Sequence, residues 1–319
     1  MMNRRNFLQS SALLSASAFL PLNTLSAETL RMKNIGIQLF SLPKLLDQDF
    51  EGGIKMLAQM GYKELELFGP YPFSAESAKK GWEQAGAMLG FSGSGYFGRT
   101  PKEVKQILDD NSLSTPSVHT DLDTLQTQMG KLGEAADILG FTYAVLPAIP
   151  DDKRKNLDDY KKIAEDFNKI GEEAKKAGIK FGYHNHGYGI SEMEGKVPLK
   201  LILEETDPNL VFFEMDIYWT TAGGIDPVEL LEAYPKRYKM MHVKDMKEKK
   251  RFSGDGNDMS QWMELFPYMT TAGDGVMNLE EIIEKGKKAG VKHFFVEQDL
   301  VSEPKVALKK SIDYLKKLS

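Results

Sequence analysis

The chain of 319 residues contains no cysteine, which excludes a disulfide framework and a metal site built on thiolates. Any metal must therefore be held by histidine, aspartate, glutamate and water. Such a mixed set of nitrogen and oxygen donors suits Mn²⁺, Fe²⁺, Co²⁺ or Zn²⁺ better than Ca²⁺, which prefers a shell of oxygen atoms.

The chain also lacks an excess of positive charge. It has 41 Lys and Arg against 46 Asp and Glu, a formal net charge of −5. Because non-specific affinity for nucleic acids comes chiefly from Lys and Arg, we expect no nucleic-acid partner. Its apolar runs fall short of the about 18 residues that a membrane-spanning helix needs, so we expect no stable membrane insertion.

Residues 1–27 differ in character from the rest of the chain. Arg4 and Arg5 precede the apolar run SALLSASAFLPL, with a cleavage site after Ala27, a pattern that resembles a twin-arginine signal peptide. We therefore expect export to the periplasm. The remaining residues, 28–319, form one expected catalytic domain, and loss of the two arginines changes its formal charge from −5 to −7.

Eight short runs rich in β-branched and aromatic residues alternate with helical stretches. A helical stretch, a glycine and an apolar run recur, for example as LAQMGYKELELF and EKGKKAGVKHFFVE, and the glycine suits a helix C-cap. The expected strands cover residues 35–39, 64–68, 115–119, 143–146, 181–184, 211–216, 240–244 and 293–297. The expected helices cover residues 48–60, 101–110, 121–139, 155–177, 195–205, 226–234, 278–290 and 303–318. This alternation predicts the α/β class and a single (β/α)8 TIM barrel.

Two stretches exceed a minimal barrel. Residues 74–90 predict an additional helix after the second strand, and residues 246–276 form a long connection after the seventh. Long connections on this fold usually carry function.

Four of the apolar runs end at or near residues that bind metals or move protons: His184, Asp216, His242 and Glu297. The carboxyl ends of barrel strands converge on one face, where the active sites of this fold lie. One such residue alone is commonly a cap or a hydrogen-bonded core residue. Four at the ends of successive strands predict one shared site for a divalent metal ion.

Three further residues each lie two positions from one of these four and therefore share its strand face. His186 shares a face with His184 and is an alternative ligand. Glu214 shares a face with Asp216, or forms hydrogen bonds inside the barrel. Lys244 shares a face with His242, where it either stabilises negative charge on a substrate or forms a salt bridge.

Further candidates line the expected mouth of the barrel. Gln38, Glu66 and His119 lie at or near the ends of the first three strands, across from the metal. Tyr218 and Trp219 follow Asp216 and form either a wall against a sugar ring or part of the core. In the segment 273–275, Asp274 would repel a phosphate group, so we expect a non-phosphorylated substrate.

The motifs GYKELELFG, YHNH, MDIYW, HVKD and FFVEQD together resemble the sugar phosphate isomerase/epimerase family of xylose isomerase-like TIM barrels, over nearly all residues after 27. The resemblance implies one metal held by His184, Asp216, His242 and Glu297. The chain departs from the family at His184, where sugar epimerases of this group usually carry glutamate. This departure argues against a mechanism that uses two carboxylates.

The resemblance implies a metal-dependent sugar isomerase or epimerase acting on a small carbohydrate through an enediolate. Glu297, His184 or His186 would remove the proton, and Lys244 would stabilise the developing charge. The same intermediate also permits β-elimination, which would make the protein a lyase or dehydratase acting on a keto-glycoside or cyclitol. Two other hypotheses are a carbohydrate-binding barrel without chemistry and a three-metal endonuclease, for which five histidines are few.

Overall fold

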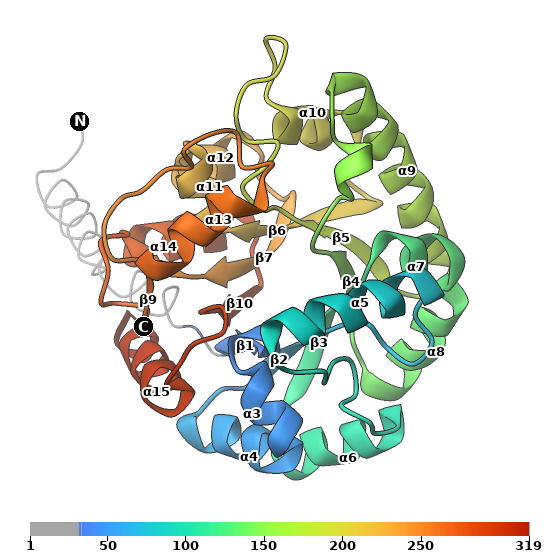
Figure 1. The fold of residues 1–319 in the computed structure, drawn as a ribbon, viewed down its shortest axis with the longest axis vertical. Coiled ribbons are helices and arrows are strands. Elements are labelled where there is room, and N and C mark those ends of the chain that lie inside the picture. The colour runs from blue at the N-terminus through green and yellow to red at the C-terminus, as the bar shows by residue number, and fades with distance from the viewer. Residues whose placement is uncertain (1–31, 33, 319) are drawn as a thin grey trace, which may run out of the picture.

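The computed structural model describes Met32 and residues 34 to 318. In this part of the chain, eight parallel strands close into a barrel in the order β1-β10-β7-β6-β5-β4-β3-β2, surrounded by helices (Figure 1). The strands are β1 (Gly36–Gln38), β2 (Glu64–Phe68), β3 (Ser114–His119), β4 (Tyr143–Leu146), β5 (Lys180–His184), β6 (Val211–Asp216), β7 (Tyr238–Val243) and β10 (His293–Val296). The predicted (β/α)8 barrel is confirmed. The predicted signal segment, residues 1–27, lies outside the described residues.

Helices follow the strands as the sequence predicts. They are α4 (Phe50–Met60), α6 (Pro101–Asp110), α7 (Leu122–Thr127), α8 (Met129–Leu139), α9 (Leu157–Lys176), α10 (Pro198–Glu205), α12 (Pro227–Ala233), α14 (Leu279–Ala289) and α15 (Pro304–Leu315). The stretch predicted as one helix over 121–139 is two, because the chain leaves helical geometry at Gln128. Gly61 and Gly290 end α4 and α14 with φ of 107° and 102°, the left-handed region that favours glycine.

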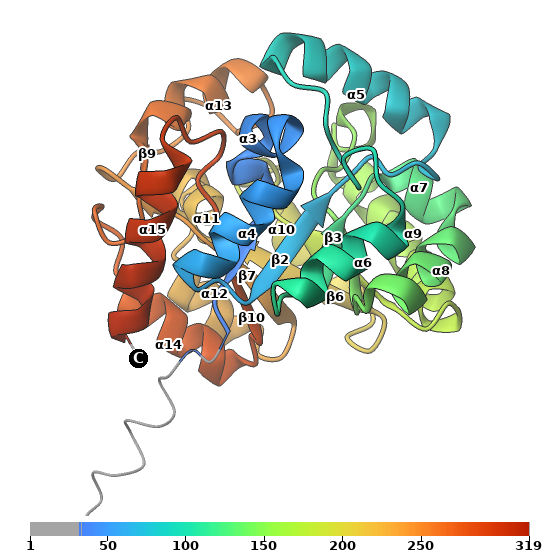
Figure 2. The ribbon, with the colours of Figure 1, turned by 90° about the horizontal axis from the view of Figure 1, so that it is seen from below.

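Additional elements gather at the carboxyl ends of the strands. The predicted extra helix is α5 (Glu76–Leu89), and the long connection after β7 contains α13 (Met259–Leu265). The same connection begins with β8 (Asp245–Met246), which pairs antiparallel with β9 (Met269–Thr270). Two short helices, α3 (Pro43–Gln48) and α11 (Ile217–Gly223), follow β1 and β6. Figure 2 shows α13, α3 and α5 at the same end of the barrel.

The barrel interior changes from apolar to polar along the strands. An apolar cluster of Tyr143, Val145, Met240 and Phe295 fills its amino-terminal half. A Cβ at Gly182 would lie 3.1 Å from Val145 and 3.3 Å from Met240, so only glycine leaves this layer undisturbed. Met240 and Phe295 lie two positions before His242 and Glu297 and therefore share their strand faces. Each face carries an apolar core residue first and a candidate site residue after it.

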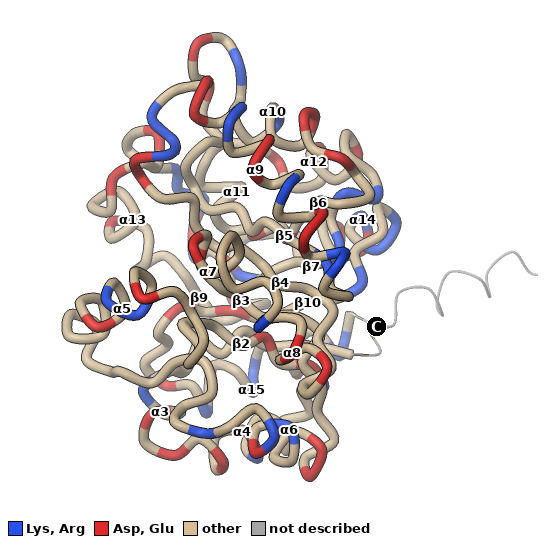
Figure 3. The backbone as a smooth tube through the Cα atoms, turned by 90° about the vertical axis from the view of Figure 1, so that its right-hand side faces the viewer, with Lys and Arg blue, Asp and Glu red and all other residues tan. Residues whose placement is uncertain are grey.

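The outer surface carries both signs of charge. On the face shown in Figure 3, Lys and Arg residues are interspersed with Asp and Glu along the helices. Pairs such as Lys176–Glu173 at 2.7 Å and Lys131–Glu134 at 2.8 Å are exposed and stabilise the fold only slightly. No helix within residues 34–318 is both long enough and apolar enough to span a bilayer.

Candidate metal site

The four predicted metal ligands come from four neighbouring strands of the barrel. His184 and Asp216 are the last residues of β5 and β6, His242 is the last but one of β7, and Glu297 directly follows β10. Asp216 lies in register with His242. All four side chains are buried, and the parallel register brings their polar atoms to one end of the barrel.

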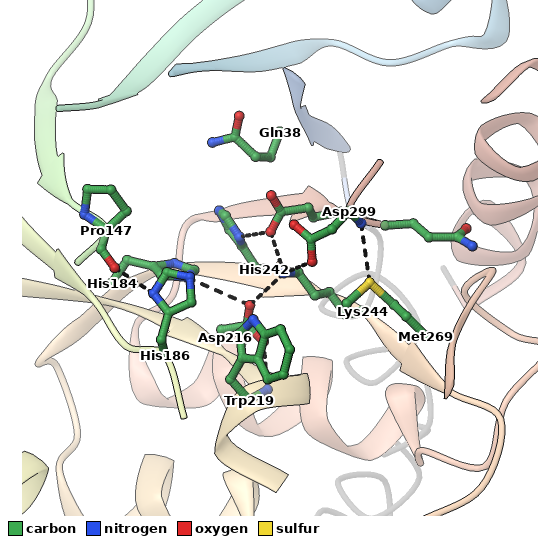
Figure 4. Close-up of polar contacts among 12 residues, drawn as sticks. Gln38, Pro147, His184, His186, Asp216, Trp219, His242, Lys244, Met269 and Asp299 are labelled. Atoms are coloured by element: carbon green, nitrogen blue, oxygen red, sulfur yellow. Dashed lines mark hydrogen bonds and ion pairs between the residues drawn. The ribbon is translucent and has the colours of Figure 1, made fainter. Parts of the chain in front are cut away.

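One group of potential ligand atoms comprises Asp216, His242 and Glu297, all within 4.8 Å of one another. Nδ1 of His242 lies 2.7 Å from Oε2 of Glu297, and Nε2 of His184 lies 3.7 Å from Oδ2 of Asp216 (Figure 4). Ligand atoms around one ion with bonds of about 2.1 Å lie roughly 3 to 3.5 Å apart. Oδ2 of Asp216 is buried and accepts no hydrogen bond among the described residues, although it forms an ion pair with Lys244 Nζ at 3.0 Å. These residues fit one divalent cation.

A second, deeper group comprises His119, His184, Glu214 and His242. Oε2 of Glu214 lies 2.7 Å from Nε2 of His119 and 3.1 Å from Nδ1 of His184. Glu214 therefore does form the hydrogen bonds inside the barrel that its position in the sequence suggested. Only His242 belongs to both groups of described residues. Of the four predicted ligands, His184 falls in the deeper group, with its Nε2 3.7 Å from Oδ2 of Asp216 in the first group.

Charge is balanced within the deeper group. Burial opposes ionisation of Glu214, but His242 and His119 outweigh it and lower the pKa of Glu214 to about 2. Burial likewise opposes protonation of His119, but Glu66 and Glu214 raise the pKa of His119 to about 9. At neutral pH an imidazolium therefore lies between two carboxylates. Burial, reinforced by His242, lowers the pKa of His184 well below its ordinary value, so that ring stays neutral.

The ammonium of Lys244 lies beside the first group. Its Nζ is 3.0 Å from Asp216 Oδ2, 2.7 Å from Glu297 Oε2 and 2.8 Å from Asp299 Oδ2. Burial favours the neutral amine, but the three carboxylates raise the pKa of Lys244 well above its ordinary value. Lys244 thus forms the salt bridges considered from the sequence.

His186 belongs to neither group of potential ligands among the described residues. Its Nδ1 donates a hydrogen bond to the backbone oxygen of Pro147 at 2.5 Å, and its ring centroid lies 4.7 Å from that of His184. Burial and then the nearby Lys244 lower the pKa of His186 to about 3. The ring is therefore neutral, and its Nε2 is an acceptor for a proton.

The two residues of the predicted aromatic wall, Tyr218 and Trp219, are both buried in one apolar cluster, the core alternative considered from the sequence. Tyr218 is buried on α11 and donates a hydrogen bond to the backbone oxygen of Leu265 at 2.6 Å. Trp219 lies near Lys244, whose Nζ is 5.6 Å from the ring centroid. Trp262 of α13 lies 5.2 Å from Trp219 and stacks on His186 at 4.9 Å.

The other three predicted contacts bind one another on the side of β1, β2 and β3. Gln38 donates a hydrogen bond to Glu66 Oε2 at 2.8 Å, and Glu66 Oε2 lies 3.2 Å from Nε2 of His119. All three side chains are buried. They meet the candidate site at His242, whose Nε2 lies 2.6 Å from Glu66 Oε2.

Asp299 and Trp262 are not among the residues predicted from the sequence. Asp299 follows Glu297 by two positions, as His186 follows His184, and side chains two positions apart on a strand share a face. This spacing was the signal for Asp299 in the sequence. Burial and the nearby Glu297 raise the pKa of Asp299 to about 7. The signal for Trp262 was its position in the long connection after the seventh strand.

Comparisons with known proteins agree with this architecture. A family model described as a xylose isomerase-like TIM barrel matches residues 54–318. A solved structure from Parabacteroides distasonis ATCC 8503, named a sugar phosphate isomerase/epimerase, is 29% identical, covers 91% of this chain and 95% of its own, and has a TM-score of 0.66. The IOLI protein with a bound zinc atom covers 89% of this chain and 96% of its own at a TM-score of 0.61, but at 13% identity it shows the fold alone.

A curated relative matches over a short stretch. Inosose dehydratase from Geobacillus kaustophilus (strain HTA426) is 39% identical over 70 residues, and this stretch spans 22% of each protein. The match of the family model covers most of the chain and agrees with the closed barrel. The chain belongs to the xylose isomerase-like TIM barrel family.

Proposed function

We propose that this protein is a divalent-metal-dependent isomerase or epimerase that moves a proton at the carbon next to the carbonyl of a non-phosphorylated sugar or keto-sugar. The observation that carries the proposal is the convergence of Asp216, His242 and Glu297 beside Lys244 and the neutral His186. A divalent cation bound there would polarise the carbonyl oxygen and so acidify the adjacent C–H bond. The name of the structural relative from Parabacteroides distasonis supports this class of reaction.

His186 is suited to remove the proton. Its Nδ1–H is bound to Pro147, so the lone pair of Nε2 is free to accept a proton. Its lowered pKa keeps this nitrogen unprotonated at neutral pH but also makes it a weak base, so it would act only on a C–H bond that the metal has strongly acidified. Glu297 directly follows β10 and His186 follows β5, with β6 and β7 between them in the barrel. A substrate carbon between the two side chains could lose a proton on one face and regain it on the other.

Lys244 is suited to stabilise the oxygen on which negative charge develops. Its ammonium is buried and already held by three carboxylates, so little reorganisation is needed when the substrate changes charge. Asp299 fixes the amine from the side opposite Asp216 (Figure 4).

The loop after β9 supports a substrate without phosphate. The backbone N–H groups of Gly273, Gly275 and Met277 all donate hydrogen bonds to the carboxylate of Asp245, at 2.9, 3.0 and 3.2 Å. A phosphate cradle needs such N–H groups free and pointing at the anion. In this chain they are bound to an internal carboxylate, which would also repel a phosphate.

A second candidate is a lyase or dehydratase that eliminates a β-oxygen substituent from the same enediolate. Two observations favour it. The curated relative over 70 residues is an inosose dehydratase, and the buried ammonium of Lys244 can stabilise the negative charge on a departing oxygen.

The two reactions can be separated in deuterated water. Metal-loaded protein is incubated with free ketoses and with 3-keto-glycosides, and the products are followed by NMR and mass spectrometry. Deuterium at the carbon next to the carbonyl, with the sugar otherwise intact, supports the isomerase. Release of the aglycone supports the lyase. Sugar binding that is unchanged by a chelator and by Glu297→Gln, with no deuterium exchange, would refute both and leave a binding protein.

A further inference from the structure

The two histidines of the candidate metal site are each held on both sides. His242 directs Nδ1 towards Glu297 and places Nε2 2.6 Å from Oε2 of Glu66. His184 directs Nε2 towards Asp216 and places Nδ1 3.1 Å from Oε2 of Glu214. In both cases the nitrogen turned away from the first group faces a fully buried carboxylate.

We propose that Glu66 and Glu214 are positioning residues: when a metal ion is bound, they hold His242 as the Nε2–H tautomer and His184 as the Nδ1–H tautomer, so that the opposite nitrogens face the metal. This inference rests on the metal site of the proposed function. A neutral imidazole has one N–H and one lone pair, and a carboxylate that accepts the N–H decides which nitrogen keeps the lone pair. Carboxylates in this arrangement also raise the basicity of the ligand nitrogen.

The two carboxylates are themselves held in place. Gln38 donates its amide N–H to Glu66 at 2.8 Å, and its amide oxygen accepts a hydrogen bond from the backbone N–H of Phe40 at 3.1 Å. His119 lies 2.7 Å from Glu214 and 3.2 Å from Glu66, so one ring contacts both carboxylates. The residues first expected to contact substrate therefore form a buried layer that orients the ligands.

The same geometry argues against a second metal ion in the deeper group. Such an ion would need lone pairs on Nδ1 of His184 and Nε2 of His242, the nitrogens that carry hydrogen when the first group is occupied. Both rings would have to lose a second proton to serve two ions. We therefore expect one metal ion per chain.

The tautomers can be measured in the unmodified protein. Zinc is a diamagnetic probe, and long-range ¹⁵N–¹H NMR of ¹⁵N-histidine-labelled, zinc-loaded protein distinguishes Nδ1–H from Nε2–H. We expect His242 as the Nε2–H form and His184 as the Nδ1–H form. Either ring in the opposite form would overturn the assignment. This measurement needs no variant and so does not depend on whether a variant folds.

Zinc affinity provides the second test. Glu66→Gln and Glu214→Gln should each weaken zinc binding by roughly 10- to 100-fold in a calorimetric titration. Glu64→Gln is the matched control, because Glu64 lies on the same strand and binds His293 Nδ1 at 2.8 Å at the other end of the barrel. Its zinc affinity should be unchanged.

Two outcomes of the titration would refute the positioning role. One is full zinc affinity in both variants, and the other is two zinc ions per wild-type chain falling to one in Glu214→Gln. Neither readout needs a substrate. Zinc binding as expected in a protein that exchanges no sugar proton would leave this inference intact and refute the proposed function instead.

Discussion

Nζ of Lys244 lies 2.7 Å from Oε2 of Glu297, the oxygen that also lies 2.7 Å from Nδ1 of His242. The buried ammonium is thus in contact with a carboxylate that a metal ion would use. A bound metal ion and the Lys244 ammonium would therefore compete for the negative charge of Glu297.

Lys244→Gln should bind zinc more tightly and turn substrate over more slowly. Loss of a buried positive charge beside the ligands removes repulsion, so we expect affinity to rise by roughly 10-fold or more. Loss of the group that stabilises developing charge should lower kcat by about 100- to 1,000-fold. Calorimetry and steady-state kinetics measure the two effects, and Lys180→Gln, at the start of β5, serves as the control. Weaker zinc binding in Lys244→Gln would show that the lysine supports the metal site.

His186→Gln should lower kcat/KM by about 100- to 10,000-fold without changing zinc affinity, because the ring acts as a base. His184→Gln should weaken zinc binding, since its Nε2 lies 3.7 Å from Asp216. Parallel zinc titrations of both variants decide which histidine is the ligand. If only His186→Gln lost affinity, the ligand assignment would pass to His186.

The stability of the metal-free protein should fall as the pH rises from about 6.5 to 9. The pKa of His119 is raised to about 9 in the folded protein, against about 6.5 in the unfolded chain. Its contribution is therefore full below 6.5 and is lost as the pH rises through 9, on the order of 2 to 3 kcal/mol. Urea unfolding with a chelator at pH 6 and pH 9.5 measures this difference.

His119→Gln should show a smaller difference between the two pH values than the wild type. His186→Gln is the control, because the folded pKa of His186 is about 3 and its linkage acts below 6.5 with the opposite sign. An unchanged pH dependence in His119→Gln would contradict the predicted imidazolium.

Trp262→Ala should raise KM by about 10-fold with a smaller change in kcat, because a half-buried ring at the site offers a stacking face for a sugar. Trp262→Phe should recover most of the affinity. Met259→Ala on the same helix is the control, since this side chain is 64% exposed. An equal loss in Met259→Ala would assign the effect to the helix rather than to the ring.

We also propose that residues 1–27 direct export of the protein to the periplasm. Residues 1–27 fused to a folded fluorescent reporter should direct it to the periplasm, and Arg4→Lys with Arg5→Lys should retain it in the cytoplasm. Fractionation measures this outcome. Equal export of both fusions would remove the twin-arginine assignment.

Much of the architecture is readable from local patterns along the chain. The continuous apolar runs and the helix–glycine–strand joints predict eight strands and their order along the chain, because the residue pattern of a strand and the residue that ends a helix are both local features of the sequence. The residues at the strand ends are readable for the same reason, since parallel strands carry their carboxyl ends to one face. Gln128 marks a failure of this approach: a stretch patterned as one helix is two.

The role of each residue inside the site depends on contacts between strands that are far apart in the sequence. Glu66 lies 176 positions from His242 and Glu214 lies 95 from His119, yet both pairs are within hydrogen-bonding distance. The alternation of side chains along a strand predicts only that Glu66 and Glu214 face the barrel interior. Barrel closure and the register between strands decide which side chains reach the metal, which orient a ligand and which pair with Lys244. Burial in that closed interior then sets which groups are charged, because removing water makes each carboxylate, imidazole and ammonium depend on its partners.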